Sequence, residues 1–406
     1  MADKKKIVLA YSGGLDTSVA IRWLQDHYEA DIVTLTMDLG ANASLDEARD
    51  RALTIGAIRA DILDVREEFV RDYVWPALQA GALYEGVYPL ATALGRPLIA
   101  KHLVRIAQEE GAFAIAHGCT GKGNDQVRFD VSAAALAPDL LVIAPAREWG
   151  MGRDQEIAYA RERDIPLNLN RRSAYSVDEN LWGRSVEAGD LEDPWLEPPE
   201  DAYAWTASAS DAPAEPLYIE VAFVRGEPVA IDGRAMDGLA LIGYLHTAAG
   251  DHGIGRIDHI ENRLVGIKSR EIYEAPAAMV LSAAHQALEA MVLTKDQSRF
   301  KERMSTEYAD LVYNGLWFSA HRLDLDSYVR STQQFVTGSV RMRLHRGTAT
   351  VVGRRSNVSL YRHDLATYDE GDSFDHKSSE GFIRLYGLPT RTQARIQGKG
   401  IEGQAP

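Results

Sequence analysis

Apolar and polar positions along the first 165 residues predict short strands that alternate with helices. Five apolar runs have the length and composition of buried strands. They lie at residues 7–10, 31–37, 58–65, 113–116 and 140–144. Segments with helical spacing lie between and after them, at residues 16–27, 44–56, 66–74, 97–111 and 154–163. This alternation is typical of βαβ units and predicts a mostly parallel sheet.

Residues 81–96 interrupt this regular pattern. They contain several glycines, two tyrosines and Pro89, and these predict an irregular loop. Proline disfavours a helix interior but fits the first turn of a helix. We therefore expect Trp75-Pro76 to end the preceding helix and Pro97 to open the next one.

The pattern changes after about residue 172. Residues 197–215 are rich in proline, alanine, serine and acidic residues, which predicts an exposed excursion. Beyond it the sequence predicts two hairpins, at residues 217–231 and 334–352, and two helices, at residues 236–249 and 276–293. The predicted fold class is α/β: a parallel-sheet domain at residues 1–172, an α+β domain at residues 173–385 and a tail at residues 386–406. The tail is polar, and we expect it either to fray or to reach onto a neighbouring subunit.

Composition narrows the classes of function. The chain has 406 residues and a net charge of −15, which argues against a broad nucleic-acid surface. Its single cysteine, Cys119, excludes an intrachain disulfide and fits a reducing compartment. The first apolar run is too short for a signal peptide, and no run is long enough to span a membrane. We therefore expect a cytoplasmic protein that binds neither membranes nor nucleic acid.

The first stretch with several side chains suited to ligand binding is AYSGGLDTS at residues 10–18. It predicts a strand, a glycine turn and the start of a helix. A helix start carries unpaired N–H groups and partial positive charge, and hydroxyl groups add donors there, so the stretch suits phosphate oxygens. It lacks the lysine of the Walker A pattern. It resembles instead the PP-loop of ATP pyrophosphatases, which cleave ATP between its α and β phosphates. The simpler alternative is a Gly-Gly turn with a helix cap.

The second stretch is HGCTGKGNDQVRF at residues 117–129, which follows the fourth predicted strand. It completes neither a GxGxxG fingerprint nor a Walker A motif. Asp125 would hold an ammonium group, Arg128 a carboxylate and Asn124 would bridge the two, as an amino-acid zwitterion requires. Lys122 is interpreted as a phosphate contact. The simpler alternative is a surface loop with a helix cap. Ligands of parallel sheets bind beyond the carboxyl ends of the strands, so both stretches should face one crevice.

Five segments together resemble the argininosuccinate synthase family. They are AYSGGLDTS (10–18), ALYEGVYPLATALGRPLIAKH (82–102), HGCTGKGNDQVRFD (117–130), YSVDENLWGRSVEAG (175–189) and HGIGRIDHIENRLVGIKSREIYEAP (252–276). The resemblance covers about residues 4–385. It implies a ligase of arginine biosynthesis that joins L-citrulline to L-aspartate with ATP, through a citrullyl-adenylate, and releases AMP and pyrophosphate. It also implies a PP-loop nucleotide-binding domain, a synthetase domain, an oligomerisation tail and a homotetramer.

The resemblance also assigns residues to each substrate. For ATP they are Ala10, Tyr11, Ser12, Gly13, Gly14, Leu15, Asp16, Thr17, Ser18, Met37 and Gly118. For aspartate they are Thr120, Asn124 and Asp125. For citrulline they are Tyr88, Ala93, Asn124, Arg128, Ser176, Ser185, Glu261 and Tyr273. Some relatives carry serine at position 93, so a contact from Ala93 would come from its main chain.

The expected chemistry needs no covalent enzyme intermediate. A ureido oxygen is a poor nucleophile, so positioning should supply much of the rate. Mg²⁺, helix-end N–H groups and hydroxyls would stabilise charge on the phosphates. The candidate catalytic residues are Ser12, Asp16, Thr17, Lys122 and Arg128, and Asp16 is expected to help hold Mg²⁺ rather than to act as a base. In the 252–276 segment, apolar residues alternate with charges, so some of these charges should pair internally.

Three other functions fit the sequence less well. A tRNA-thiolating enzyme usually needs paired catalytic cysteines and a basic surface, and both the single cysteine and the net charge argue against it. A glutamine-using synthetase needs a glutaminase domain, for which no spare segment is long enough. A regulatory module that senses ATP without turnover would not need the many polar groups beyond the PP-loop.

Overall fold

The computed structural model describes residues 4–41, 44–166 and 175–398. The described residues up to Val358 form one compact unit, and those from Ser359 onward form a second. The expected domain boundary at residue 172 lies outside the described residues, as does the end of the tail from residue 399.

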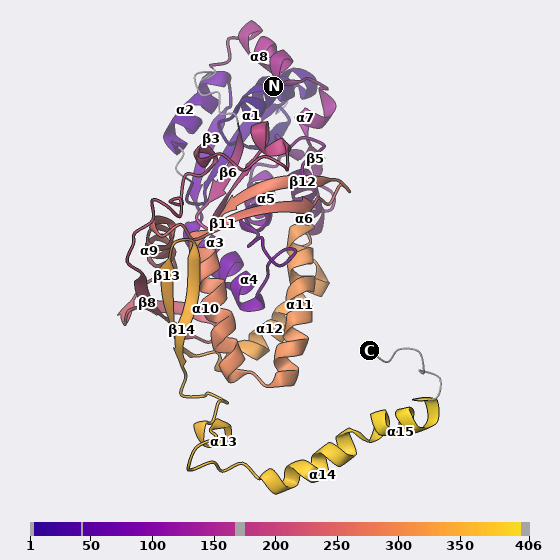
Figure 1. The fold of residues 1–406 in the computed structure, drawn as a ribbon. Helices are drawn as coiled ribbons and strands as arrows, with labels where there is room; N and C mark the ends of the chain where they lie inside the picture. The colour runs from indigo at the N-terminus through magenta and orange to yellow at the C-terminus, as the bar shows by residue number, and fades with distance from the viewer. Residues whose placement is uncertain (1–3, 42–43, 167–174, 399–406) are drawn as a thin grey trace. The chain divides into compact units, whose positions relative to one another are not determined.

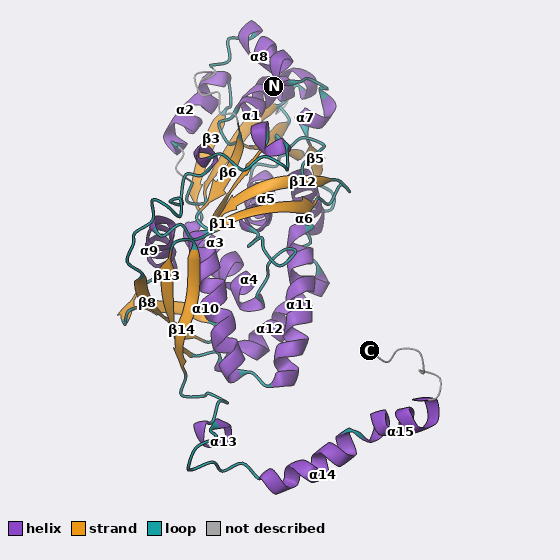
Figure 2. Cartoon of the chain, viewed as in Figure 1, coloured by secondary structure: helices purple, strands orange, loops and turns teal. Residues whose placement is uncertain are grey.

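The N-terminal part of the first unit contains a sheet flanked by helices (Figures 1 and 2). This sheet has five strands in the order β3-β2-β1-β4-β5. Its strands are β1 (Lys6–Ala10), β2 (Asp31–Asp38), β3 (Arg59–Asp64), β4 (Ala114–Ala116) and β5 (Leu141–Ile143). All neighbouring pairs are parallel. The central strand β1 is apolar and its Ile7, Val8 and Leu9 are fully buried, because helices cover both faces of such a sheet. The predicted parallel α/β sheet is confirmed.

Helices connect and cover these strands. They are α1 (Leu15–Tyr28), α2 (Leu45–Ile55), α3 (Arg66–Phe69), α4 (Trp75–Ala80), α5 (Ala91–Glu109), α6 (Asp125–Leu136), α7 (Pro145–Glu148) and α8 (Arg153–Glu162). Strand order reverses at β1, which pairs with β2 on one side and β4 on the other. The pair Leu9↔Ala116 places the ends of β1 and β4 side by side. The loop after β1 and the loop after β4 therefore lie at the same edge of the sheet, as predicted.

Two predictions on helix ends were wrong. The helix after Arg66 does not stop at Trp75-Pro76: a π-helical turn (Val70–Val74) leads into α4, and the proline lies in the first turn of α4, where its missing N–H is tolerated. Helix α5 begins at Ala91, so Pro97 lies inside it. The hydroxyl of Tyr88 accepts a hydrogen bond from the backbone N–H of Thr92, which supports this earlier start.

The rest of the first unit contains two antiparallel sheets (Figure 2). One has the order β11-β12-β7-β6, with β6 (Ser176–Asn180), β7 (Gly183–Glu187), β11 (Arg256–Asn262) and β12 (Lys268–Glu274). The other has the order β10-β9-β8-β13-β14, with β8 (Leu217–Val224), β9 (Glu227–Ile231), β10 (Arg234–Ala235), β13 (Gly338–His345) and β14 (Thr348–Arg355). Both predicted hairpins are confirmed by the β8–β9 and β13–β14 pairings.

Four longer helices accompany these sheets. They are α9 (Gly238–Asp251), α10 (Pro276–Val292), α11 (Lys295–Tyr313) and α12 (Ala320–Thr332). Helices α9 and α10 match the two predicted helices. Helix α10 buries an alanine-rich face, including Ala277, Ala278 and Ala284, in the largest apolar core of the chain. Residues 197–215 are largely exposed, but Ala202, Thr206 and Ala212 are buried and anchor the segment.

The second unit contains α13 (His363–Ala366), α14 (His376–Tyr386) and α15 (Leu388–Gln397). Large apolar side chains on it are exposed, among them Tyr368, Phe382 and Tyr386. Helices occupy much of the part that the sequence predicts to be a tail. None of the helices within the described residues has both the length and the apolar character needed to cross a membrane.

Candidate functional site

The first loop forms the strand-turn-helix junction that its sequence predicts. Gly13 has a φ of +76°, a conformation that glycine adopts without strain. Helix α1 then begins at Leu15, with no side chain capping its first N–H groups. The Ser12 and Thr17 hydroxyls lie 3.2 Å apart beside this helix start. Free N–H groups and two hydroxyls thus converge where a phosphate would bind.

Charged side chains from other helices approach this loop. Arg51 of α2 donates a hydrogen bond to the carbonyl of Gly13. Glu156 of α8, which is 7% exposed, hydrogen bonds to Asp16. Burial and the charge of Asp16 raise the pKa of Glu156 to about 8, so Glu156 holds a proton at neutral pH. Local sequence patterns revealed neither contact, because both partners lie far along the chain.

The loop after β4 is held by residues on α6 and α7. His117 is buried; its Nε2 lies 2.9 Å from a carboxylate oxygen of Asp130, and its Nδ1 accepts the backbone N–H of Cys119. Gln126 donates to the carbonyls of Gly121 and Gly123. These bonds fix both ends of the loop.

The two loops also touch each other. A Cβ placed on Gly118 would lie 2.7 Å from Cγ2 of Thr17, so only glycine fits here without a shift. Burial raises the pKa of the Cys119 thiol above its usual range. This thiol is therefore a packed neutral group and not a nucleophile.

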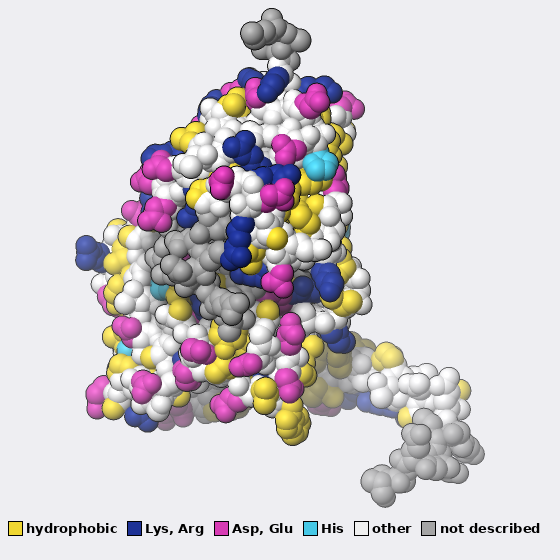
Figure 3. All heavy atoms as spheres, turned by 90° about the horizontal axis from the view of Figure 1, so that it is seen from above, with side chains coloured by type: hydrophobic (Ala, Val, Ile, Leu, Met, Phe, Trp, Pro, Cys, Tyr) yellow, Lys and Arg dark blue, Asp and Glu magenta, His cyan; other side chains and the backbone are white. Residues whose placement is uncertain are grey.

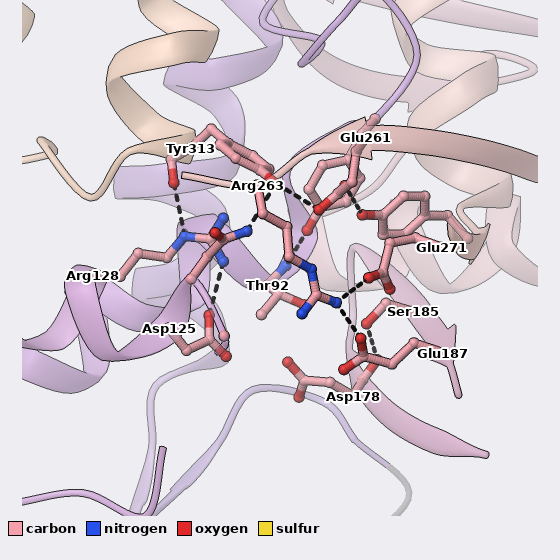
Figure 4. A pocket seen from close by; sticks show the side chains of 14 residues that line it. Thr92, Asp125, Arg128, Asp178, Ser185, Glu187, Glu261, Arg263, Glu271 and Tyr313 are labelled. Carbon is pink, nitrogen blue, oxygen red and sulfur yellow. Dashed lines mark hydrogen bonds and ion pairs between the residues drawn. The ribbon is translucent and has the colours of Figure 1, made fainter. Parts of the chain in front are cut away.

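A polar pocket lies beside the second loop (Figure 4). Its walls come from α5, α6, the β11-β12-β7-β6 sheet and the end of α11. The lining residues are Tyr88, Thr92, Gly123, Asn124, Asp125, Arg128, Asp178, Ser185, Glu187, Glu261, Arg263, Glu271, Tyr273 and Tyr313. Carboxylates and guanidinium groups thus face one space, as recognition of a zwitterion requires.

Glu261 is the carboxylate at the centre of this pocket and is 3% exposed. Both of its oxygens accept hydrogen bonds from phenols, each 2.5 Å long, one from Tyr273 and one from Tyr313. Burial raises the pKa values of both tyrosines, so both hydroxyls keep their protons and donate. The guanidinium groups of Arg263 and Arg270 pair with Glu271 and Asp258, and no ion pair joins Glu261 to a described residue.

Arg128 is linked to Glu261 through Tyr313, which bonds to both residues. Its Nη1 bonds to Asp125 at 2.8 Å, and its Nε donates to the carbonyl of Tyr313 at 2.9 Å. Asp125 also pairs with Arg96, so two guanidinium groups share this carboxylate and lower its pKa. Asp125 thereby fixes the orientation of Arg128 in the pocket wall (Figure 4).

Arg263 lies between two other carboxylates. Its Nη2 contacts both Glu187 and Glu271, and its Nε donates to Ser269 at 2.7 Å (Figure 4). Burial and the charge of Glu187 raise the pKa of Glu271 to about 8, against the opposing effect of Arg263. The expectation that some charges of the 252–276 segment pair internally is met here.

The structure brings most of the predicted citrulline residues together. Those lining the pocket are Tyr88, Asn124, Arg128, Ser185, Glu261 and Tyr273. Two others lie elsewhere: Ala93 is fully buried within α5, and Ser176 of β6 is exposed and does not line the pocket. Thr92, beside Ala93, faces the pocket instead.

The predicted aspartate and phosphate residues differ in exposure. Asn124 and Asp125 line the pocket, whereas Thr120 and Lys122 are exposed in the loop after β4. Met37, at the end of β2, is partly buried and packs against the core.

Several lining residues were not predicted. They are Thr92, Asp178, Glu187, Arg263, Glu271 and Tyr313. Charged residues spaced by apolar ones in the 252–276 segment signalled Arg263 and Glu271. No comparable local signal marks Tyr313, which ends an otherwise ordinary helix.

Comparisons with known proteins identify the family of the chain. Residues 6–166 match a model described as the arginosuccinate synthase N-terminal HUP domain, and residues 175–393 match the arginosuccinate synthase C-terminal domain. An argininosuccinate synthase from Dehalococcoides mccartyi is 58% identical over 393 residues, covering 97% of each chain. One from Symbiobacterium thermophilum is 56% identical over 395 residues, covering 97% of this chain and 98% of its own. One from Gloeobacter violaceus is 58% identical and covers 97% of this chain and 99% of its own. The chain belongs to the argininosuccinate synthase family.

Proposed function

We propose that the pocket around Glu261 binds L-citrulline and that the adjoining loops bind ATP and L-aspartate. As a member of its family, the chain joins citrulline to aspartate in arginine biosynthesis, with cleavage of ATP to AMP and pyrophosphate. The observation that supports this assignment of the pocket is the carboxylate of Glu261, which is buried, held by two neutral phenols and lines the same pocket as Arg128. An uncompensated carboxylate beside a guanidinium matches an amino-acid zwitterion.

The geometry supports the binding of different substrates by the two loops. The N–H groups at the start of α1, with Ser12 and Thr17, would hold the phosphates of ATP. The citrulline ureido oxygen would then attack the α-phosphate and pyrophosphate would leave. In the second step the aspartate amine attacks the ureido carbon and AMP leaves. Asn124 and Asp125, between the two substrates, would place the aspartate. Positioning of this kind supplies much of the rate without a covalent enzyme intermediate.

A magnesium ion fits the first loop when it is carried by ATP. The described residues contain no group of three or more histidine, cysteine or acidic side chains that would hold a metal alone. The loop does offer Asp16 and two hydroxyls, and Mg²⁺ commonly binds through one carboxylate together with substrate phosphates. When bound, the ion would neutralise charge on the phosphates.

The assembly and location are also part of the proposal. A homotetramer in the cytoplasm is proposed from the family and from the large apolar side chains exposed on the second unit, such as Tyr368 and Phe382. Neither membrane nor nucleic acid is proposed as a partner: basic and acidic side chains are interspersed on the face in Figure 3. Equilibrium sedimentation tests the assembly, and a monomer would contradict it.

A coupled pyrophosphate assay tests the reaction. Sustained release of pyrophosphate should require ATP, citrulline and aspartate together. Without citrulline it should stay at background, and without aspartate it should stop after a single turnover, because the adenylate is then not consumed. Glu261→Gln should raise the KM for citrulline strongly, because the amide lacks the charge. Glu109→Gln, an exposed change on α5, is the matched control and should leave the KM unaltered. ATP binding without citrulline-dependent release would contradict the proposed function.

A further inference from the structure

Tyr313 is the last residue of α11 and is 1% exposed. Its hydroxyl lies between two residues of the proposed substrate sites. It donates to Oε1 of Glu261 at 2.5 Å, and it lies 2.8 Å from Nδ2 of Asn124. We infer that Tyr313 is a positioning residue that joins the citrulline and aspartate subsites. This inference rests on the proposed function.

The direction of each hydrogen bond follows from the single proton of the hydroxyl. The carboxylate of Glu261 only accepts, so the hydroxyl proton of Tyr313 points to it. The hydroxyl therefore accepts from the amide nitrogen of Asn124. The amide oxygen of Asn124 is then turned to the backbone N–H of Leu264, which it meets at 2.9 Å. Tyr313 thus fixes both the carboxylate of Glu261 and the amide orientation of Asn124.

Contacts elsewhere on Tyr313 hold its ring without help from the hydroxyl. The ring stacks on Tyr84 with centroids 3.5 Å apart and planes 4° from parallel. The guanidinium of Arg128 lies 4.9 Å from the ring centre and donates to the Tyr313 carbonyl. Phenylalanine would keep all these contacts, so Tyr313→Phe removes only the hydroxyl.

The two substrates are coupled through this hydroxyl. An ammonium group that binds Glu261 competes with the Tyr313 hydroxyl for the carboxylate oxygens of Glu261. The same hydroxyl holds the Asn124 amide in its orientation, so loss of the hydroxyl disturbs both subsites. By contrast, Tyr273 donates to the other oxygen of Glu261 and makes no bond to Asn124. Its hydroxyl should serve the citrulline subsite alone.

Steady-state kinetics on the full-length enzyme separate these roles. For Tyr313→Phe we expect the KM values of both citrulline and aspartate to rise about tenfold or more, the range for one hydrogen bond to a charged group, and the KM of ATP to stay within twofold. For Tyr273→Phe only the citrulline KM should rise. Tyr308→Phe is the control, because Tyr308 is a buried tyrosine on the same helix whose hydroxyl bonds to Asp326. It should lower the melting temperature and leave every KM unchanged.

Each outcome decides the inference. An aspartate KM within twofold of wild type in Tyr313→Phe overturns it, as does an equal change in Tyr308→Phe. A wild-type enzyme that neither binds citrulline by calorimetry nor releases pyrophosphate overturns the proposed function first and this inference with it. Should Tyr313→Phe not fold, 3,5-difluorotyrosine at position 313 keeps the ring and alters only the strength of the hydroxyl as donor and acceptor. Both amino-acid KM values should then move by more than twofold, and unchanged values overturn the inference.

Discussion

Glu274, the last residue of β12, offers the sharpest test of how the second half of the chain is held together. Its side chain is fully buried and accepts five hydrogen bonds. One oxygen accepts from Arg184 at 2.7 Å and from the N–H of Ala204 at 2.9 Å. The other accepts from the N–H groups of Trp205 and Thr206 and from the Thr206 hydroxyl, at 2.7 to 3.0 Å. One carboxylate thus ties the segment after residue 200 to the strand that carries Tyr273.

Glu274→Gln should destabilise the protein by about 4 kcal/mol. The amide has a single acceptor oxygen, which in its best orientation keeps the three bonds from Trp205 and Thr206. Its NH₂ group then faces Arg184 and the N–H of Ala204, so two bonds to a charged group are lost, each worth about 1.5–3 kcal/mol. Loss of one partner from a buried ion pair costs a similar amount, about 3–5 kcal/mol.

Urea unfolding followed by tryptophan fluorescence measures this change, because Trp182 and Trp205 lie in the affected region. The midpoint should fall with no change in the slope of the transition. Glu109→Gln is the control: Glu109 is exposed and pairs with Arg105 on the same helix, so its loss should cost about 0.5 kcal/mol or less. A loss below about 1 kcal/mol in Glu274→Gln would refute the reasoning, since it would mean that these bonds are replaced by water or by movement.

Gly118→Ala should raise the KM of ATP more than that of citrulline in steady-state assays, because a Cβ there meets Thr17 at 2.7 Å; equal changes would contradict this. The pKa of Glu271 rises from about 4.5 unfolded to about 8 folded, so this group favours folding at low pH and loses that effect as pH rises through 8. Urea titrations of the ligand-free protein should therefore show a stability that falls between these pH values by up to about 1.4 kcal/mol per unit more than in Glu271→Gln, and parallel curves would refute it. Gly315→Ala should cost about 2 kcal/mol in the same assay, since Gly315 has a φ of +78° and its Cβ would lie 2.8 Å from Cα of Arg128; an unchanged midpoint would exclude this strain.

The sequence predicted those features of the structure whose determining residues lie close together along the chain. The turn at Gly13 and the helix from Leu15 follow β1 directly, so pattern and chemistry coincide there. The loop after β4 is likewise continuous with Asn124 and Arg128 on α6. The general rule that ligands bind beyond the carboxyl ends of parallel strands placed both loops at one crevice. These parts of the site were therefore accessible from sequence alone.

The features that the sequence did not predict depend on distant partners. Helix α5 begins early because the hydroxyl of Tyr88 meets the N–H of Thr92, a contact that composition does not reveal. Strands β6 and β7 carry polar side chains that line the pocket, such as Asp178 and Glu187, so their pattern resembles that of a loop. Tyr313 reaches Asn124 across 189 positions of sequence, and only the packing of α11 brings the two together.

The distribution of charge explains why the site needs both halves of the first unit. The loop after β4 supplies Arg128, but its own carboxylate, Asp125, is shared between Arg96 and Arg128. A carboxylate neutralised by two guanidinium groups has little charge left for an ammonium group. Glu261 comes from the antiparallel sheet, and phenols rather than guanidinium groups bind both of its oxygens. The proposed zwitterion pocket therefore draws its cation, Arg128, from helix α6 beside the parallel sheet and its anion, Glu261, from the antiparallel sheet.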